Sequence, residues 1–213
     1  MIALYDYHRS SAAYRVRIAL NLKGLHYESQ PVDLLDGGQS DETYRRINPQ
    51  GRVPTLVDPQ QALGQSLAII EFLDETCPDP PLLPDEARAR ARVRQLAQIV
   101  ACDIHPLNNL RVLQHLEQQL GTSEEQRRAW YRRWIAEGFA AIETLLDDER
   151  TGRYCHGDAP TMADCCLVPQ VYNARRWDCD LSPYPSICRI DASCLSLPAF
   201  ARARPEAQPR APR

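Results

Sequence analysis

The feature that most constrains the fold is a proline-rich segment between two differently patterned halves. Residues 77–84 read Cys-Pro-Asp-Pro-Pro-Leu-Leu-Pro, with four prolines within seven positions. Proline lacks the backbone N–H that helices and sheets use, so this segment is interpreted as a linker. The chain of 213 residues is long enough for two small domains with cores of their own. The sequence therefore predicts one domain over residues 1–80 and a second over residues 86–213.

The first half alternates between strand and helix signals. Apolar or alternating runs predict four strands, at residues 2–5, 27–32, 55–57 and 62–63. Helical patterns lie between and after them, at residues 11–23, 39–47 and 66–76. A βαβ unit followed by a hairpin and a helix gives a small mixed sheet with helical cover.

The second half has the pattern of helices throughout. Apolar residues recur at intervals of three and four from Val93 to Leu107, and Pro106 is expected to kink or break that helix. Capping boxes predict the starts of two further helices, at Ser123 and at Thr161. We therefore expect an all-helical C-terminal domain.

Composition argues against several classes of protein. The formal net charge is -3 and no long block of like charge occurs, whereas nucleic-acid-binding domains usually carry a basic stripe. No apolar run approaches the roughly 20 residues that span a membrane. The sequence starts with a strand-like run rather than a basic segment and an apolar core, so we expect no secretion signal and a cytoplasmic location.

The cysteines show no metal-binding or disulfide pattern. There are eight, at positions 77, 102, 155, 165, 166, 179, 188 and 194. None forms a Cys-x-x-Cys pair, and the adjacent Cys165 and Cys166 cannot readily chelate one ion together. We expect reduced, mostly buried thiols and no metal site.

Polar residues gather at the starts of the first and third predicted helices. Ser10 and Ser11 open the first helix beside Arg9, and Gln65 and Ser66 open the third. A helix N-terminus concentrates N–H donors and positive potential, so it can hold an anion such as a thiolate or a carboxylate. Taken alone, each serine is best explained as an N-cap.

Two more segments present polar groups that are suited to binding a ligand. Pro54 directly precedes a predicted strand, and a cis Val53–Pro54 bond would expose backbone groups at a sharp turn. Residues 103–111, Asp-Ile-His-Pro-Leu-Asn-Asn-Leu-Arg, place polar side chains around the expected helix break. Alone, the first indicates only a turn, and a single histidine in the second is more often structural than catalytic.

Together, these elements resemble the glutathione transferase fold in order and spacing, over almost the whole chain. The halves are similar to its α/β thioredoxin-like N-terminal domain and its all-α C-terminal domain. Residues 9–20, Arg-Ser-Ser-Ala-Ala-Tyr-Arg-Val-Arg-Ile-Ala-Leu, resemble the zeta class, as do residues 65–71 and 161–164. Residues 102–111 are similar to the bacterial branch that contains maleylacetoacetate and maleylpyruvate isomerases.

This resemblance implies a glutathione-dependent cis–trans isomerase that converts maleylacetoacetate to fumarylacetoacetate in tyrosine and phenylalanine catabolism. Glutathione would be the coenzyme, because its thiolate adds to the cis double bond and leaves after rotation. The chain departs from the family pattern at three positions: a cysteine is replaced by Ala12, a tryptophan by Tyr14 and an aromatic residue by His8. Without that cysteine, the thiolate must come from glutathione.

The positions that match the family pattern imply a role for each candidate site residue. Ser10 and Ser11 are the catalytic candidates, with Ser10 favoured as the partner of the sulfur and Ser11 as its neighbour and cap. The resemblance adds eight further glutathione ligands: Gln39, Val53, Gln65, Ser66, Asp103, His105, Asn109 and Arg111. Arg9 and Arg176 are expected to bind the carboxylates of the substrate, whereas for Arg175 a solvated surface position is as good an interpretation.

Three alternative functions stay open. The motifs do not separate maleylacetoacetate from maleylpyruvate, the substrate of the gentisate pathway, although Leu110 favours the first. A general transferase that conjugates glutathione to electrophiles would share the same motifs. A non-catalytic scaffold of this fold would usually lose Ser10, the Val-Pro turn and the Gln-Ser helix start, which are all present. The resemblance also implies a homodimer.

Overall fold

A mixed four-stranded sheet lies at the centre of the N-terminal half in the computed structural model, which describes residues 2–209. The strands are β1 (Ile2–Asp6), β2 (Tyr27–Pro31), β3 (Thr55–Val57) and β4 (Ala62–Gly64). Their order in the sheet is β2-β1-β3-β4; β1 is parallel to β2 and antiparallel to β3, and β3 is antiparallel to β4. The four predicted strands are confirmed to within one residue at each end.

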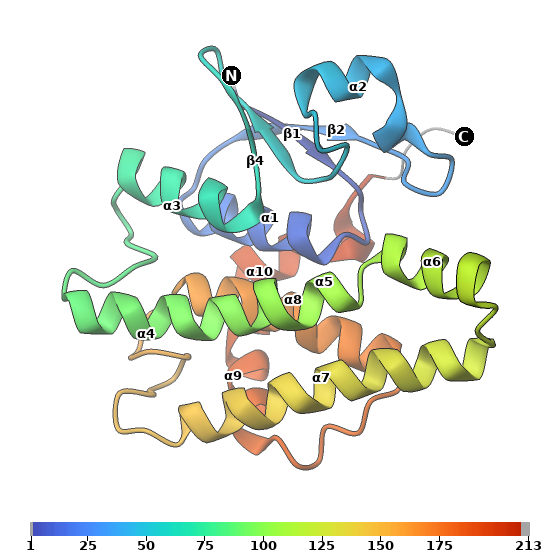
Figure 1. Ribbon diagram of the computed structural model, residues 1–213. Helices are drawn as coiled ribbons and strands as arrows, with labels where there is room; N and C mark the ends of the chain where they lie inside the picture. Colours follow the sequence, from blue (N-terminus) through green and yellow to red (C-terminus); the bar gives the residue numbers. More distant parts are fainter. Residues whose placement is uncertain (1, 210–213) are drawn as a thin grey trace. The chain divides into compact units, whose positions relative to one another are not determined.

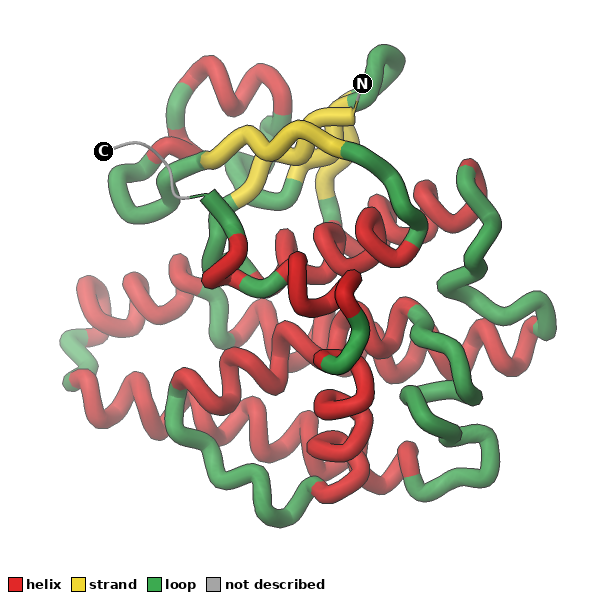
Figure 2. The backbone as a smooth tube through the Cα atoms, turned by 180° about the vertical axis from the view of Figure 1, so that it is seen from behind, coloured by secondary structure: helices red, strands yellow, loops and turns green. Residues whose placement is uncertain are grey.

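Helices cover both faces of this sheet. Helices α1 (Ser11–Leu22) and α3 (Ser66–Thr76) lie on one face and α2 (Glu42–Ile47) on the other (Figure 1). Figure 2 shows the same sheet between its helices from behind. The helix predicted at residues 39–47 is divided into a 3₁₀ turn (Gly38–Ser40) and α2, because Asp41 between them has an extended backbone (φ -60°, ψ 139°).

Helix α1 carries two buried arginines, Arg15 and Arg17, which are 2% and 0% exposed. The Nη1 of Arg17 donates to both carboxylate oxygens of Asp6 on β1, at 2.8 and 2.7 Å. Its Nε donates to the carbonyl oxygen of Ala203 at 2.9 Å. A buried charge is tolerated only when it is paired and hydrogen-bonded, so Arg17 fixes α1 to β1 and to the C-terminal segment.

The described C-terminal residues pack in the N-terminal unit. The described residues form two compact units, 2–82 with 195–209, and 83–194. Helix α10 (Pro198–Ala203) lies against α1, where the Nδ2 of Asn21 donates to the carbonyl oxygen of Ala199 at 2.9 Å. This grouping differs from the predicted range 86–213 for the helical domain. Residues 210–213 of that range lie outside the described residues.

The second unit is built from helices. They are α4 (Ala87–Gln98), a π-helical turn (Ile99–Ile104), α5 (His105–Leu107), α6 (Leu110–Leu120), α7 (Glu124–Leu146), α8 (Met162–Arg176) and α9 (Pro185–Leu195). Helix α8 is buried along almost its whole length and packs on α4. The capping boxes predicted at Ser123 and Thr161 are confirmed.

The helix does not break at Pro106 itself, where the sequence predicts the break, but on either side of it. The π-helical turn precedes Pro106, and the helical backbone ends at Asn108 (φ -101°, ψ 9°). The Ile104 side chain occupies the space beside Gly138 of α7, where a Cβ atom would lie 2.3 Å from its Cδ1. Gly138 therefore allows α7 to approach this turn closely.

All eight cysteines are free, and Cys155, Cys165, Cys166 and Cys194 are buried. Burial raises the pKa of the Cys155 and Cys194 thiols, which keeps them protonated at neutral pH. Among residues 2–209, no helix is long and apolar enough to cross a membrane. The same residues contain no group of three or more side chains suited to hold a metal ion.

Candidate active site

Ser10 caps the N-terminus of α1. Its backbone is extended (φ -68°, ψ 116°), and its Oγ accepts a hydrogen bond from the backbone N–H of Ala13 at 3.2 Å. Ser11 is the first helical residue and is 7% exposed. The prediction that Ser11 provides the cap is therefore wrong, because the extended residue before the first turn is the one whose oxygen reaches back to the free N–H groups.

The capping bond leaves the proton of Ser10 available. A hydroxyl accepts through its lone pairs and donates through its single hydrogen, so Ser10 can cap α1 and donate to an anion at once. The first turn of α1 contains no acidic residue that would offset the positive end of the helix dipole. This helix end is therefore suited to an anion. Arg9 beside it is exposed, and its Nη2 donates to the Tyr7 hydroxyl at 3.3 Å.

The Val53–Pro54 peptide bond is cis, as the sequence predicts. Buried polar side chains hold the carbonyl oxygen of Arg52, the residue before Val53. The Nδ2 of Asn48 donates to the carbonyl oxygen of Arg52 at 2.8 Å and to the Thr55 hydroxyl at 2.9 Å. The Tyr44 hydroxyl donates to the same carbonyl oxygen at 2.5 Å. The turn is thus fixed by α2 and by the segment that follows it.

Asn48→Ala is expected to lower the free energy of unfolding by about 1–3 kcal/mol, because it removes the donor of two buried hydrogen bonds. Asn48 is 6% exposed, so water cannot easily replace the amide. Denaturant unfolding measures the change. The control is Thr43→Ala at an exposed position on α2, for which we expect a change of no more than about 0.5 kcal/mol. Equal stability of Asn48→Ala and the control would contradict this account of the turn.

The start of α3 has a strained backbone. Gln65 is the N-cap and has φ 67°, which is unusual for a residue other than glycine. Ser66 is the first helical residue and is 6% exposed, so the expectation that it caps the helix is wrong. The Oγ of Ser66 accepts a hydrogen bond from Nη1 of the buried Arg15 at 3.1 Å. Strain of this kind persists where the surroundings hold it, often at functional sites.

Gln50 belongs beside this helix start, although the sequence interpretation did not include it. Its Oε1 accepts a hydrogen bond from Nε2 of Gln65 at 2.8 Å. Its place in the Asn-Pro-Gln-Gly segment just before the Val-Pro turn was the available signal.

Gln39 lies against the turn that leads to Val53. It belongs to the 3₁₀ turn, and its carbonyl oxygen lies 2.7 Å from where a Cβ of Gly51 would be. Gly51 has φ +59°, so both its conformation and this contact favour glycine. The structure thus brings Gln39 next to the segment that carries Val53.

In the second unit, three of the predicted residues are neighbours around the helix break. Asn109 caps α6 with its Oδ1, which accepts the backbone N–H of Arg111 at 3.2 Å. The Nδ2 of Asn109 lies 3.5 Å from Nε2 of His105. Asp103 is exposed on the π-helical turn, and Arg111 is exposed on α6.

Arg176 is exposed at the end of α8, with its guanidinium 5.8 Å from the centre of the Trp177 ring. That ring stacks on Tyr131 with centroids 4.2 Å apart, and burial raises the pKa of Tyr131 to about 12. Arg175 instead forms an ion pair with the buried Asp191 at 2.7 Å. A solvated surface position therefore describes Arg175 only in part, because its charge compensates that of a buried carboxylate.

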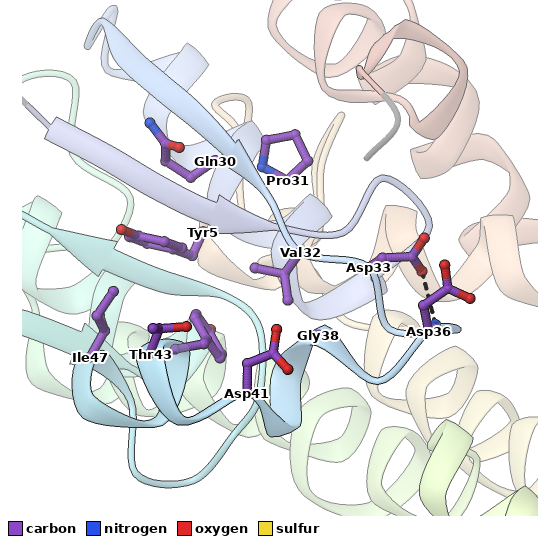
Figure 3. A pocket seen from close by; sticks show the side chains of 11 residues that line it. Tyr5, Gln30, Pro31, Val32, Asp33, Asp36, Gly38, Asp41, Thr43 and Ile47 are labelled. Atoms are coloured by element: carbon purple, nitrogen blue, oxygen red, sulfur yellow. Dashed lines mark hydrogen bonds between the residues drawn. The ribbon is translucent and has the colours of Figure 1, made fainter. Parts of the chain in front are cut away.

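A separate cavity of about 520 Å³ lies between β2 and α2 and contains none of the predicted site residues (Figure 3). Asp33, Asp36 and Asp41 contribute carboxylates to its lining, together with Tyr5 and Val32. The Oδ1 of Asp33 accepts the backbone N–H of Leu35 at 2.8 Å. Its acidic lining makes the cavity unlike the end of α1, where no acidic residue lies in the first turn.

Comparison with known proteins gives consistent matches. Residues 4–81 match the glutathione S-transferase N-terminal domain, and residues 110–187 match the glutathione S-transferase C-terminal domain. The chain is 53% identical to the maleylacetoacetate isomerase of Rhizobium meliloti (strain 1021), over 95% of both proteins.

Two solved structures are similar over nearly the whole chain. The holo structure of maleyl pyruvate isomerase, a bacterial zeta-class glutathione S-transferase, has a TM-score of 0.96 at 51% identity and covers 97% of this chain and 98% of that one. The maleylacetoacetate isomerase of Methylobacterium extorquens AM1, with bound malonate and GSH, has a TM-score of 0.95 at 46% identity. It covers 99% of this chain and 100% of that one.

Proposed function

The chain belongs to the zeta class of the glutathione transferase family, and we propose that it is a glutathione-dependent maleylacetoacetate isomerase that forms fumarylacetoacetate. The observation that carries this proposal is the N-terminus of α1, where Ser10 caps a helix start that has no acidic residue in its first turn. The chain's relatives include a protein named maleylacetoacetate isomerase. The related structure from Methylobacterium extorquens contains bound GSH.

The donor set at α1 fits a thiolate. An ordinary thiol has a pKa near about 8.5, and a helix N-terminus can lower this value by one to several units. A decrease of two units corresponds to roughly 2.7 kcal/mol of preference for the thiolate. The hydroxyl of Ser10 adds a charge-assisted hydrogen bond to the effect of the helix dipole.

Glutathione supplies the thiolate that adds reversibly to the cis double bond of the maleyl substrate. The chain supplies the environment: Ser10 and the α1 N-terminus stabilise the charge on sulfur, and Ser11 lies beside them. With Ala12 in place of a cysteine, the first turn of α1 offers no competing protein thiol. Arg9 and Arg176 hold the carboxylates of the substrate in this proposal, since guanidinium groups bind carboxylates in a bidentate manner.

The remaining glutathione ligands keep the assignments that the resemblance gives them. In the first unit these are Gln39, Val53, Gln65 and Ser66, with the γ-glutamyl carboxylate at the start of α3. In the second unit they are Asp103, His105, Asn109 and Arg111, with Asp103 assigned to neutralise the γ-glutamyl ammonium. Gln50 joins the proposal as the side chain that orients Gln65.

The direct test of this function is turnover of maleylacetoacetate with glutathione far below the substrate concentration. We expect many turnovers per glutathione, formation of fumarylacetoacetate and no loss of glutathione. Stoichiometric consumption of glutathione would instead indicate a conjugating transferase. Failure to bind millimolar glutathione in calorimetry would indicate a non-catalytic scaffold.

The choice of substrate requires a second measurement. Maleylacetoacetate and maleylpyruvate share the reacting maleyl unit and differ beyond it, so both fit the proposed chemistry. We expect a higher kcat/KM for maleylacetoacetate. A strong preference for maleylpyruvate would overturn this choice and leave the isomerase mechanism in place.

The assembly and location are proposals that rest on the family. We propose a homodimer, which light scattering in solution tests by giving twice the mass of one chain. We also propose a cytoplasmic location for the reaction, which fractionation of cells tests. A monomer by light scattering or recovery of the protein outside the cytoplasm would contradict these proposals.

A further inference from the structure

Arg15 is a buried cation whose side chain reaches from α1 to the start of α3. It is 2% exposed, and its Nη1 donates to the Oγ of Ser66 at 3.1 Å. The two helices pack together on one face of the sheet (Figure 1). This contact places a permanent positive charge directly behind the first residue of α3, because guanidinium stays protonated in proteins.

The hydrogen bond from Arg15 determines what the Ser66 hydroxyl can do. A serine hydroxyl has one hydrogen to donate and two lone pairs that accept. Since one lone pair receives the hydrogen bond from Arg15, the Ser66 hydrogen must point away from the guanidinium. It is then available to an acceptor in front of the helix, on the side where the N–H groups of the first turn also lack helical partners.

Together these donors are suited to an acceptor that carries negative charge. The positive end of α3, the Ser66 hydrogen and the charge of Arg15 all favour a carboxylate over a neutral group. Gln65, with φ 67°, bends the chain into this helix start, and its side chain is held by Gln50. The start of α3 is thus preorganised before any ligand binds, which lowers the entropic cost of binding.

We propose that Arg15 is a positioning residue for the coenzyme: by donating to Ser66 Oγ, it directs the Ser66 hydroxyl towards the γ-glutamyl carboxylate of glutathione. The inference rests on the proposed function, which assigns that carboxylate to the start of α3. It adds a residue that does not touch glutathione and that acts on the carboxylate through Ser66.

The test compares two ligands by calorimetry: glutathione, and its analogue 4-aminobutyryl-cysteinyl-glycine, which lacks only the γ-glutamyl carboxylate. We expect Arg15→Gln to raise the Kd of glutathione about tenfold, the loss of one charge-assisted hydrogen bond, and to change the Kd of the analogue less than about twofold. Arg15→Lys keeps the charge and should recover part of the affinity for glutathione. Arg15→Lys also serves as the test variant if Arg15→Gln does not fold. In that case we expect a smaller rise in the Kd of glutathione, again with little change in the Kd of the analogue.

The double variant Arg15→Gln/Ser66→Ala shows whether Arg15 affects the affinity for glutathione through Ser66. We expect it to bind glutathione no more weakly than Ser66→Ala alone, because Arg15 acts through the hydroxyl that is already absent. The matched control is Lys23→Met, which removes another buried cation that joins α1 to α3, through Asp74 at 2.9 Å. It should lower stability and leave the ratio of the two Kd values unchanged.

Two results would overturn the inference while the proposed function stands. One is equal weakening of both ligands by the Arg15 variants, which indicates a purely structural role. The other is additive losses in the double variant, which indicate that Arg15 acts independently of Ser66. A wild-type protein that binds neither ligand would instead overturn the proposed function together with the inference.

Discussion

Ser10→Ala is expected to lower kcat for maleylacetoacetate about 100-fold, with little change in KM. Removing one preorganised hydrogen-bond donor from charge that develops in the transition state typically costs a factor of about 10²–10³ in kcat, and sulfur regains its negative charge as the thiolate leaves. The variant loses the donor to sulfur and also the cap of α1, where Ser10 Oγ accepts the N–H of Ala13. A fall in kcat at constant KM identifies an interaction that matters for the chemical step rather than for substrate binding.

Two control variants separate these effects. Ser10→Thr keeps a hydroxyl that can both cap and donate, so we expect it to retain most of the activity. Ser11→Ala leaves the cap intact and should change kcat much less than Ser10→Ala. An unchanged rate in Ser10→Ala, with loss in Ser11→Ala, would transfer the role to Ser11.

Asp6→Asn is expected to lower the free energy of unfolding by about 3–5 kcal/mol. It leaves the Arg17 guanidinium charged and without its carboxylate in a site where the two side chains are 0% and 3% exposed. The same guanidinium donates to the carbonyl oxygens of Ala203 and His8. Breaking the pair therefore loosens β1, α1 and α10 together. Denaturant titration of the variant measures the loss.

The control for this prediction is an ion pair on the surface. Arg46 and Glu42 lie 2.6 Å apart but are 71% and 83% exposed, so Glu42→Gln should cost no more than about 1 kcal/mol. If both substitutions cost the same, the buried pair does not hold β1, α1 and α10 together.

Much of the fold could be predicted because local patterns coincide with the packing. The strands and helices of the first unit follow from apolar periodicity and from two breaks: Gly24, which comes directly after the first predicted helix, and the proline segment. The capping boxes at Ser123 and Thr161 mark helix starts by chemistry that acts within four residues.

The structure differs from the sequence prediction where the conformation depends on more than the local sequence pattern. Nothing local in residues 195–209 shows that they pack on α1, since that depends on Arg17 and Asn21 reaching their backbone carbonyls. The caps were misplaced by one residue at Ser11 and Ser66, because neighbouring polar residues in a sequence do not show which of them leaves the helical conformation. Gln65 illustrates this, since its positive φ cannot be read from its side-chain type.

The candidate site likewise has a part that could be predicted from the sequence and a part that could not. The types of its residues could be predicted from the family pattern, whereas the residues that support them could not. Arg15 acts behind Ser66 through a buried contact between segments 51 residues apart. Asn48 and Tyr44 lie only four and eight residues from Arg52, but their bonds to its carbonyl oxygen depend on how α2 packs against the cis-proline turn.

The most direct test of the central claim is an ultraviolet titration of the glutathione thiolate in complex with the protein. If Ser10 and the α1 N-terminus stabilise the thiolate, the bound thiol should have a pKa about one to two units below the usual value near 8.5. Ser10→Ala should raise the pKa of the bound thiol towards that value. A bound thiol that titrates like free glutathione in the wild-type protein would contradict the account.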